Sequence, residues 1–204
     1  MSSVILARSE NPAIHDVYRF RHQVFHDRLG WEVGSDQGLE HDRFDKLNPV
    51  HMFSRNRHRQ VEACWRLLPT TGPYMLKDIF PQLLREESAP SDPHIWEISR
   101  FAVVPAAGRT PGRDQANICD LTFDLLRAGV DFADRNGIRQ YVFVTSVAVE
   151  RLLKSTGLSI YRFGDGRSQK VGKVLSVACW IDINAATRQA VYRHGTVSLP
   201  QEAA

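Results

Sequence analysis

Hydrophobic side chains recur along the chain with two periods that change from segment to segment. Alternation of apolar and polar residues predicts strands, and apolar residues three or four positions apart predict helices. The predicted strands are residues 4–7, 50–54, 60–69, 95–104, 140–146, 159–164 and 173–183. The predicted helices are residues 11–25, 75–80, 118–135, 147–157 and 185–194. This mixed order predicts an α/β fold, a three-layer α/β/α sandwich around a mixed, twisted sheet.

One long segment, from Gly30 to Pro49, has little periodicity and a string of acidic residues. Loops of this length in a compact domain are usually binding elements or disordered segments. Trp31 and Phe44 argue against simple disorder. We therefore expect this loop to be a binding element.

The stretch IWEISRFAVVP, Ile95 to Pro105, places charges inside an otherwise apolar strand. A buried charge costs several kcal/mol unless it is paired, so Glu97 and Arg100 need a partner or a chemical role. Strict alternation puts Glu97 and Ser99 on one side and Arg100 on the other. Glu97 and Arg100 can share a site only if this central strand bulges or splays.

Composition and charge narrow the class of protein. The 204 residues are 43% hydrophobic and 24% charged with a net charge of +3, which fits a single folded domain over residues 1–204 and gives no argument for nucleic acid. No segment has the run of about 18 apolar residues that a membrane span needs, and the amino terminus has no basic targeting region. We expect a cytoplasmic protein with no membrane span.

Cysteine and histidine spacing gives little support for disulfides or metal. Cys64, Cys119 and Cys179 are far apart and fit buried thiols. His22 and His26 have the i, i+4 spacing that binds zinc on a helix, but the glutamate of HExxH is missing and no third ligand is evident. We expect no metal site.

Four motifs in order resemble the acyl-homoserine-lactone synthase (autoinducer synthase) family of bacterial quorum sensing. They are RFRHQVFHDRLGW, LEHDRFD, WRLLPTTGPYML with IFP, and WEISRF. The resemblance covers nearly the whole chain and implies a fold similar to GCN5-related acetyltransferases. It also implies transfer of an acyl chain from acyl carrier protein to the amine of S-adenosylmethionine, then lactone closure with release of methylthioadenosine. S-adenosylmethionine would be a co-substrate, with no prosthetic group.

The family's characteristic residues are matched here in type. They fall on Arg21, Phe25, Trp31, Asp42, Asp45, Arg66, Phe80, Glu97 and Arg100. S-adenosylmethionine carries a sulfonium, an ammonium, a carboxylate and an adenine ring, so its site needs acids, an arginine and aromatic faces. The resemblance implies catalytic roles for Arg21, Asp45, Glu97 and Arg100, and cofactor binding by Phe25, Trp31, Asp42, Arg66 and Phe80.

The acidic and basic members of this set suggest one ion-pair network of Arg21, Asp42, Asp45, Glu97 and Arg100. Phe25 and Trp31 would enclose the cofactor. The alternative for the carboxylate run of Glu40, Asp42 and Asp45 is an ordinary solvated loop.

Acyl transfer needs a base, because an ammonium cannot attack a thioester until it loses a proton. Glu97, between Trp96 and Ile98, is expected to have a raised pKa and to accept that proton directly or through water. The alternative is a structural ion pair with an arginine. Backbone N–H groups freed where the strand splays are candidates for stabilising the thioester oxyanion.

The acyl chain needs an apolar tunnel, which the strands WEISRFAV and QYVFVTS and the helix starting near Ile118 can line. The resemblance implies that Ser99 and Thr145 lie near the acyl chain; the alternative for Thr145 is an ordinary strand residue in the core.

Acyl carrier proteins are acidic, so a basic docking surface is expected. Arg151 and Lys154 match positions where the family is often basic. A second cluster, Arg55, Arg57 and Arg59, fits a solvated turn, and GRTPGR only loosely echoes the pyrophosphate loop of acetyltransferases.

Two other functions remain open on this sequence. The nearest is an acetyltransferase-like N-acyltransferase that uses acyl-CoA. The motifs LEHDRFD and WRLLPTTGPYML argue against it. The other is a non-catalytic module that senses a small ligand or binds nucleic acid. Near-neutral charge and the core-facing Arg21, Glu97 and Arg100 argue against it.

Overall fold

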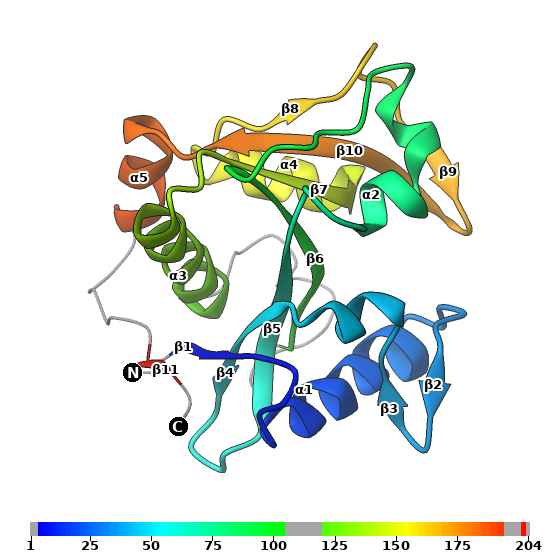
Figure 1. The fold of residues 1–204 in the computed structure, drawn as a ribbon, viewed down its shortest axis with the longest axis vertical. Helices are drawn as coiled ribbons and strands as arrows, with labels where there is room; N and C mark the ends of the chain where they lie inside the picture. The colour runs from blue at the N-terminus through cyan, green and yellow to red at the C-terminus, as the bar shows by residue number, and fades with distance from the viewer. Residues whose placement is uncertain (1–3, 105–119, 194–200, 203–204) are drawn as a thin grey trace.

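The computed structural model describes residues 4–104, 120–193 and 201–202, and these are built around one mixed sheet (Figure 1). Nine strands form it in the order β11-β1-β4-β5-β6-β7-β10-β8, with β9 also paired to β10. The strands are β1 (Val4–Ala7), β4 (Val50–Arg55), β5 (Val61–Pro69), β6 (Ile95–Val103), β7 (Gln140–Ser146), β8 (Tyr161–Arg162), β9 (Gln169–Val171), β10 (Val174–Asp182) and β11 (Gln201–Glu202). Only the β1–β11 and β6–β7 pairs among them are parallel.

Helices cover both faces of this sheet, which confirms the predicted three layers. The first face carries α1 (Ile14–Arg21), the π-helix η1 (His22–Arg28), α2 (Met75–Asp78) and the 3₁₀ helix η3 (Pro81–Leu84). The second face carries α3 (Asp120–Asn136), α4 (Val147–Ser155) and α5 (Ala185–Tyr192). Successive side chains of a strand point to opposite faces, so each strand contributes to the hydrophobic core on both faces of the sheet. Phe53 and Cys64 pack under α1, whereas Met52 and Trp65 pack under α3.

The two central strands separate partway along their length. β6 and β7 pair in parallel only from Ile95 to Ile98, opposite Gln140 to Phe143. Beyond that point β6 stays paired with β5 and β7 stays paired with β10. The sheet therefore opens into two halves, which Figure 1 shows as β5 and β6 curving away from β7 and β10. This confirms the predicted splayed central strand.

A β-bulge in β6 resolves the alternation problem at Glu97 and Arg100. Arg66 pairs with Ser99, but Cys64 pairs with Ala102, so two residues of β6, Arg100 and Phe101, stand opposite one residue of β5. Arg100 takes a positive φ of 55°, a conformation that costs energy for a side chain other than glycine. The extra residue turns Arg100 to the first face, which Glu97 and Ser99 share, while Phe101 packs on the second.

The long loop is more structured than its pattern predicts. It contains a two-stranded hairpin of β2 (Ser35–Asp36) and β3 (Leu39–Glu40), followed by the 3₁₀ helix η2 (Arg43–Leu47). Asp42 caps η2: its carboxylate accepts from the backbone N–H of Phe44, while Asp45 accepts from the N–H of Asp42. This capping holds both carboxylates in place.

Most other predicted elements are present within one or two residues of their expected bounds. The first helix starts later than the Asn11–Pro12 signal, at Ile14, and becomes a π-helix at His22. Ile118, Cys119 and the GRTPGR segment, residues 108–113, lie outside the described residues. In the described part of the chain, no helix is both long and apolar enough to cross a membrane.

Candidate active site

Three arginines and three carboxylates form a closed ring of ion pairs on the first face of the sheet. Going round it, the members are Arg21, Glu40, Arg100, Asp42, Arg66, Asp45 and again Arg21. We call this set the ion ring. Each carboxylate bridges two arginines and each arginine bridges two carboxylates, so the charges balance within the ring.

The contacts of the ring are short and directional. Arg21 donates from Nη1 and Nη2 to the two carboxylate oxygens of Asp45 at 2.9 and 3.0 Å, and from Nε to Glu40 at 2.5 Å. Arg100 donates from Nε to Glu40 at 3.0 Å and from Nη2 to Asp42 at 2.9 Å. Arg66 Nη1 lies 2.6 Å from Asp42 and 2.9 Å from Asp45. Charge-assisted pairs of this geometry fix orientation as well as providing energy.

Burial makes the ring strongly coupled. Arg21, Glu40 and Arg66 are 0% exposed. Burial alone would raise the pKa of the Asp45 carboxyl, but the nearby Arg21 and Arg66 outweigh it and hold that pKa far below its usual range. His51 Nε2 lies 3.7 Å from Asp45, and burial lowers the pKa of His51 to about 3, so its neutral imidazole leaves the charge balance unchanged.

Glu97 is on the same face but outside the ring. Its side chain is 1% exposed, and its two oxygens accept from the backbone N–H groups of Met75 at 3.0 Å and Leu76 at 2.6 Å, at the start of α2. Burial raises the pKa of Glu97 to about 7, although the two hydrogen bonds and the more distant Arg66 and Arg100 oppose the rise. The predicted network that includes Glu97 is therefore wrong in that member, and neither Glu97 oxygen is in an ion pair within the described residues.

An aromatic wall stands beside Arg100. The rings of Phe25 and Trp31 are stacked, with centroids 5.3 Å apart, and the Arg100 guanidinium lies 5.7 Å from the centre of the Phe25 ring. Trp31 is 42% exposed, so part of this side chain is accessible to a ligand. Phe80 packs against Met75, next to both Glu97 and Arg100. The structure thus brings Phe25 and Trp31 together beside Arg100, and places Phe80 against the cluster that contains Met75.

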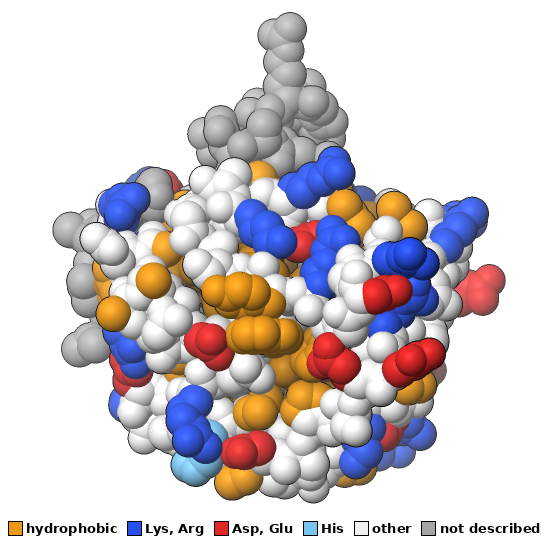
Figure 2. All heavy atoms as spheres, turned by 90° about the horizontal axis from the view of Figure 1, so that it is seen from above, with side chains coloured by type: hydrophobic (Ala, Val, Ile, Leu, Met, Phe, Trp, Pro, Cys, Tyr) orange, Lys and Arg blue, Asp and Glu red, His pale blue; other side chains and the backbone are white. Residues whose placement is uncertain are grey.

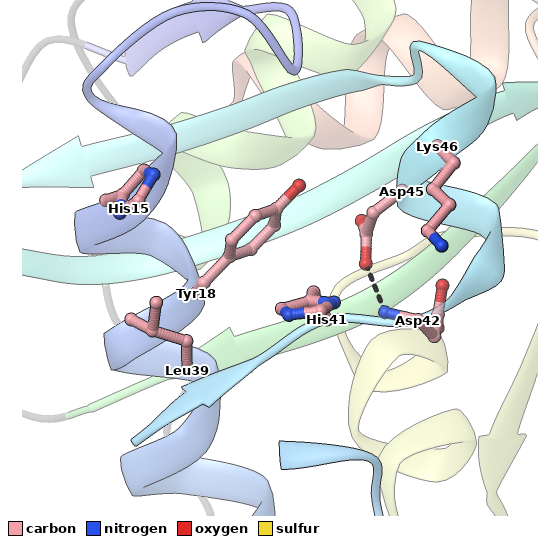
Figure 3. Close-up of a pocket in the computed structure, with 7 residues that line it drawn as sticks. All are labelled: His15, Tyr18, Leu39, His41, Asp42, Asp45 and Lys46. Carbon is pink, nitrogen blue, oxygen red and sulfur yellow. Dashed lines mark hydrogen bonds between the residues drawn. The ribbon is translucent and has the colours of Figure 1, made fainter. Parts of the chain in front are cut away.

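A cavity of about 210 Å³ lies behind the acids of the ring, between α1 and η2 (Figure 3). Asp42, Asp45 and Tyr18 line it, together with His15, Leu39, His41 and Lys46. Figure 3 shows Tyr18 pointing from α1 toward Asp45, and His41 beside Asp42. Asp42 therefore serves both the ring and this cavity.

Ser99 and Thr145 lie on opposite faces of the sheet. Ser99 Oγ accepts from Arg66 Nε at 3.1 Å on the first face. Thr145 pairs with Val177, whose side chain belongs to the core on the second face. A chain that contacts both hydroxyls would have to pass between the separated ends of β6 and β7.

An apolar cavity of about 30 Å³ lies on that second face. Its walls include Ile98, where β6 leaves β7, together with Trp65 and Tyr141 from the sheet and Leu126 and Gly129 from α3. An ideal Cβ at Gly129 would lie 2.7 Å from the Trp65 ring, so this glycine makes room for the indole. The expected tunnel strands and the helix α3 therefore do enclose an apolar space.

The two residues expected at a basic docking surface lie on α4. Arg151 is exposed, and Lys154 Nζ lies 2.8 Å from the buried carboxylate of Glu150, which Arg162 of β8 also binds. Figure 2 looks down on the end of the molecule that carries β8 and β10, and shows Lys and Arg side chains gathered beside a hydrophobic stretch. Tyr161 and Trp180 stack on this sheet edge with ring centroids 4.4 Å apart.

Glu40 is the member of the ring that the pattern of the sequence missed. It sits in a polar loop, where a carboxylate is normally solvated, yet it is fully buried between Arg21 and Arg100. The loop from Gly30 to Pro49 carries five acids, so a count of charges does not single out Glu40 as the third carboxylate of the ring. Arg55, of the second basic cluster, pairs with Asp16, whereas Arg57 and Arg59 are exposed.

Comparison with known proteins gives consistent matches. The family described as Autoinducer synthase matches residues 6–191. An acyl-homoserine-lactone synthase of Aliivibrio fischeri is 40% identical over 175 residues, covering 86% of this chain and 89% of that protein. The crystal structure of the AHL synthase LasI superposes with a TM-score of 0.80 at 37% identity, covering 97% of this chain and 99% of that one.

Two further structures define the breadth of the likeness. BjaI, a CoA-dependent acyl-homoserine lactone synthase solved with SAM and isopentyl-CoA, has a TM-score of 0.83 at 27% identity, covering 100% of this chain and 94% of that one. A putative N-acetyltransferase from Lactobacillus plantarum has a TM-score of 0.58 at 14% identity, covering 89% of this chain and 99% of that one, which shows a shared fold alone.

Proposed function

The chain belongs to the autoinducer synthase family and is an acyltransferase that makes an acyl-homoserine lactone, and from that premise we propose how its residues divide the reaction. The acyl group passes from a thioester to the amine of S-adenosylmethionine, forming an amide and releasing a thiol. The substrate's own carboxylate then attacks the carbon beside the sulfonium, which closes the lactone and releases methylthioadenosine.

S-adenosylmethionine occupies the first face of the sheet, between the Phe25–Trp31 wall and the acids of the ion ring. The exposed part of the Trp31 side chain suits the adenine ring, and Asp42, which is partly exposed, attracts the sulfonium or the ammonium. Arg100 is available to the carboxylate of the substrate, since its guanidinium is not fully buried. The bound ligand of BjaI, named as SAM, supports a co-substrate of this type.

Arg21, Asp45 and Arg66 act as positioning residues in this scheme. Arg21 and Arg66 are fully buried and Asp45 nearly so, and Asp45 pairs with both arginines; Arg66 Nη2 has no hydrogen-bond partner within the described residues. Their contacts orient Asp42 and Arg100, the two members that reach the surface of the site. Because these side chains are already held in place, they need to reorganise little when the charged substrate binds.

Glu97 is the general base, and its burial beside Arg100, with a pKa near 7, is the observation that carries the proposal. An acid with that pKa is a carboxylate about half of the time at neutral pH and can accept a proton from the ammonium directly or through one water. The backbone N–H groups of β6 beyond Ile98, where pairing with β7 ends, are candidates for holding the thioester oxyanion.

The acyl chain passes through the opening between β6 and β7 to the second face. Ser99 on one side and Thr145 on the other flank this path, and the apolar cavity near Ile98 and Trp65 receives the end of the chain.

Acyl carrier protein is the proposed donor, docking on Arg151 and Lys154 of α4 by charge complementarity. Acyl-CoA is the alternative, which the description of BjaI as CoA-dependent keeps in view. The test incubates purified protein with S-adenosylmethionine and either acyl carrier protein or coenzyme A carrying the same acyl chain, with products identified by mass spectrometry. We expect lactone and methylthioadenosine to form with the acyl carrier protein as donor, and to form much more slowly with acyl-CoA. If no lactone forms with either donor, the proposed function is refuted.

A further inference from the structure

Two histidines and an aspartate come together on η1. Phe25 of the same helix is buried, whereas His26 and Asp27 are exposed and His22 is partly exposed. His26 Nδ1 lies 2.8 Å from Asp27 Oδ1, and His22 Nε2 lies 3.3 Å from the same oxygen. The two imidazoles are stacked, with ring centroids 4.6 Å apart and planes at 15°. All three potential ligand atoms lie within 4.8 Å of one another.

The π-helix explains why this cluster exists. A π-helix closes i to i+5 hydrogen bonds, as Leu29 N to Val24 O does here at 3.0 Å, so residues five apart lie over one another in successive turns. His22 and Asp27 are five apart. In a regular α-helix only the pair His22 and His26 would share a side, which is why the sequence offers two ligands and the structure offers three.

His22 is oriented from behind by a residue of the neighbouring hairpin. Ser35 Oγ, on β2, lies 2.6 Å from His22 Nδ1. When Nδ1–H donates to that hydroxyl, the lone pair of Nε2 points to the Asp27 side, which is the arrangement that metal-binding histidines use. β2 lies next to the helix in the fold (Figure 1), and the hydrogen bond ties the two elements together.

We propose that His22, His26 and Asp27 form a binding site for a divalent ion of the zinc class, with water as the fourth ligand. Separations of 2.8 and 3.3 Å between ligand atoms are close to the edges of a tetrahedron whose centre is about 2.0–2.1 Å from each, the usual Zn–N and Zn–O distance. The exposure of His26 and Asp27, 52% and 54% for their side chains, leaves room for the ion and its water. The site lies on the same helix as Phe25 but uses none of the side chains assigned to acyl transfer.

Calorimetric titration of the untagged, full-length protein with ZnCl₂ tests the site. One equivalent is expected to bind, and His22→Gln, His26→Gln and Asp27→Asn are each expected to weaken binding by at least about tenfold. His58→Gln, at an exposed histidine in the β4–β5 turn, is the matched control and should bind as the parent does. Ser35→Ala should weaken binding less than loss of a ligand, because it frees His22 without removing it.

Titration with Co²⁺ gives an independent readout, since tetrahedral Co²⁺ absorbs visible light far more strongly than the hydrated ion. The visible band should be present in the parent protein and lost in His22→Gln, with unchanged circular dichroism showing that the variant is folded. The proposal is overturned if the parent protein binds no Zn²⁺, or if all three ligand variants bind it as tightly as the His58→Gln control.

Discussion

Glu97 and Arg100 project from the same face of β6, although residues three apart on a regular strand point to opposite faces. Both reach the first residue of α2: Glu97 accepts from the Met75 N–H at 3.0 Å, and Arg100 Nη1 lies 3.2 Å from the Met75 sulfur. The bulge at Arg100 places a base candidate and a cationic anchor on one face, where both contact Met75. Three of the five predictions below concern that site and the ring that supports it.

Replacing Glu97 by Gln should lower kcat by roughly 100- to 10,000-fold, the usual contribution of a positioned base. The amide keeps the size of the side chain and one of the two acceptors for α2, so the variant should remain folded. Steady-state kinetics with mass-spectrometric detection, alongside circular dichroism, measures both. A folded Glu97→Gln protein with near-normal turnover would show that Glu97 is not the base.

The rate should rise with pH through about 7, because Glu97 accepts a proton only as a carboxylate and its pKa is about 7. The free energy of unfolding should move the other way. The folded-state pKa is raised above the ordinary 4.5, so folding favours the protonated form and the contribution of this residue to stability decreases as pH rises from 4.5 through 7. In Glu97→Gln, neither the rate nor the free energy of unfolding should change with pH around 7 through this residue. If the rate of that variant still rises with pH at the same midpoint, the titrating group is another residue.

Replacing Glu40 by Gln should destabilise the protein by about 3–5 kcal/mol, because it leaves Arg21 and Arg100 buried with incomplete compensation. Glu32→Gln, an exposed position in the same loop, is the matched control and should change stability by less than about 0.5 kcal/mol. Urea denaturation at neutral pH compares the two. Equal stability of both variants would mean that the ring contributes little to folding.

Replacing Gly129 by Ala should shift the products toward shorter acyl chains. The new Cβ would lie 2.7 Å from the Trp65 ring, so the indole must move toward the apolar cavity that both residues line. Trp65→Phe should restore longer chains in the double variant; the change loses no hydrogen bond, since Trp65 Nε1 has no partner within the described structure. Mass spectrometry of products from a mixed pool of acyl donors reads out the distribution, and an unchanged distribution in Gly129→Ala would place the acyl chain elsewhere.

Reversing the charge of Arg151 should raise the KM for acyl carrier protein by roughly tenfold while leaving the KM for S-adenosylmethionine unchanged. Arg151 is the better test than Lys154, because Lys154 is tied to the buried Glu150 and its replacement disturbs α4. Arg57→Glu makes the same charge change in the β4–β5 turn and serves as the control. If Arg57→Glu has the larger effect on the carrier protein, the docking surface lies at that turn.

Much of the architecture follows from periodicity, because strands buried on both faces and amphipathic helices carry strong local signals. β4, β5, β7 and α4 match their predicted ranges closely for that reason. The need for an irregular β6 also followed from the sequence, since Glu97 and Arg100 could not otherwise meet. The position of the extra residue did not, because it depends on the register between β5 and β6.

At the site, the features that the sequence does not predict depend on contacts between distant segments. The sequence places Glu97, the candidate base, in one ion-pair network with Arg21 and Arg100, but in the structure its carboxylate accepts two backbone N–H groups of α2 that no local pattern predicts. A polar loop predicts a solvated Glu40, but contacts with Arg21 of α1 and Arg100 of β6 bury it. β11, two residues pairing with β1 from the far end of the chain, has no sequence signal of useful length.

The ion ring also constrains how this chain can change over generations. Each of its six side chains is held by two others of opposite charge, so the loss of any one leaves two neighbours partly unpaired in a buried setting. Substitutions at these positions are therefore strongly non-additive, and a change harmful alone is tolerable only beside a matching change at an adjoining position. Substitutions can therefore accumulate independently at positions outside the ring, whereas the ring positions have to change together.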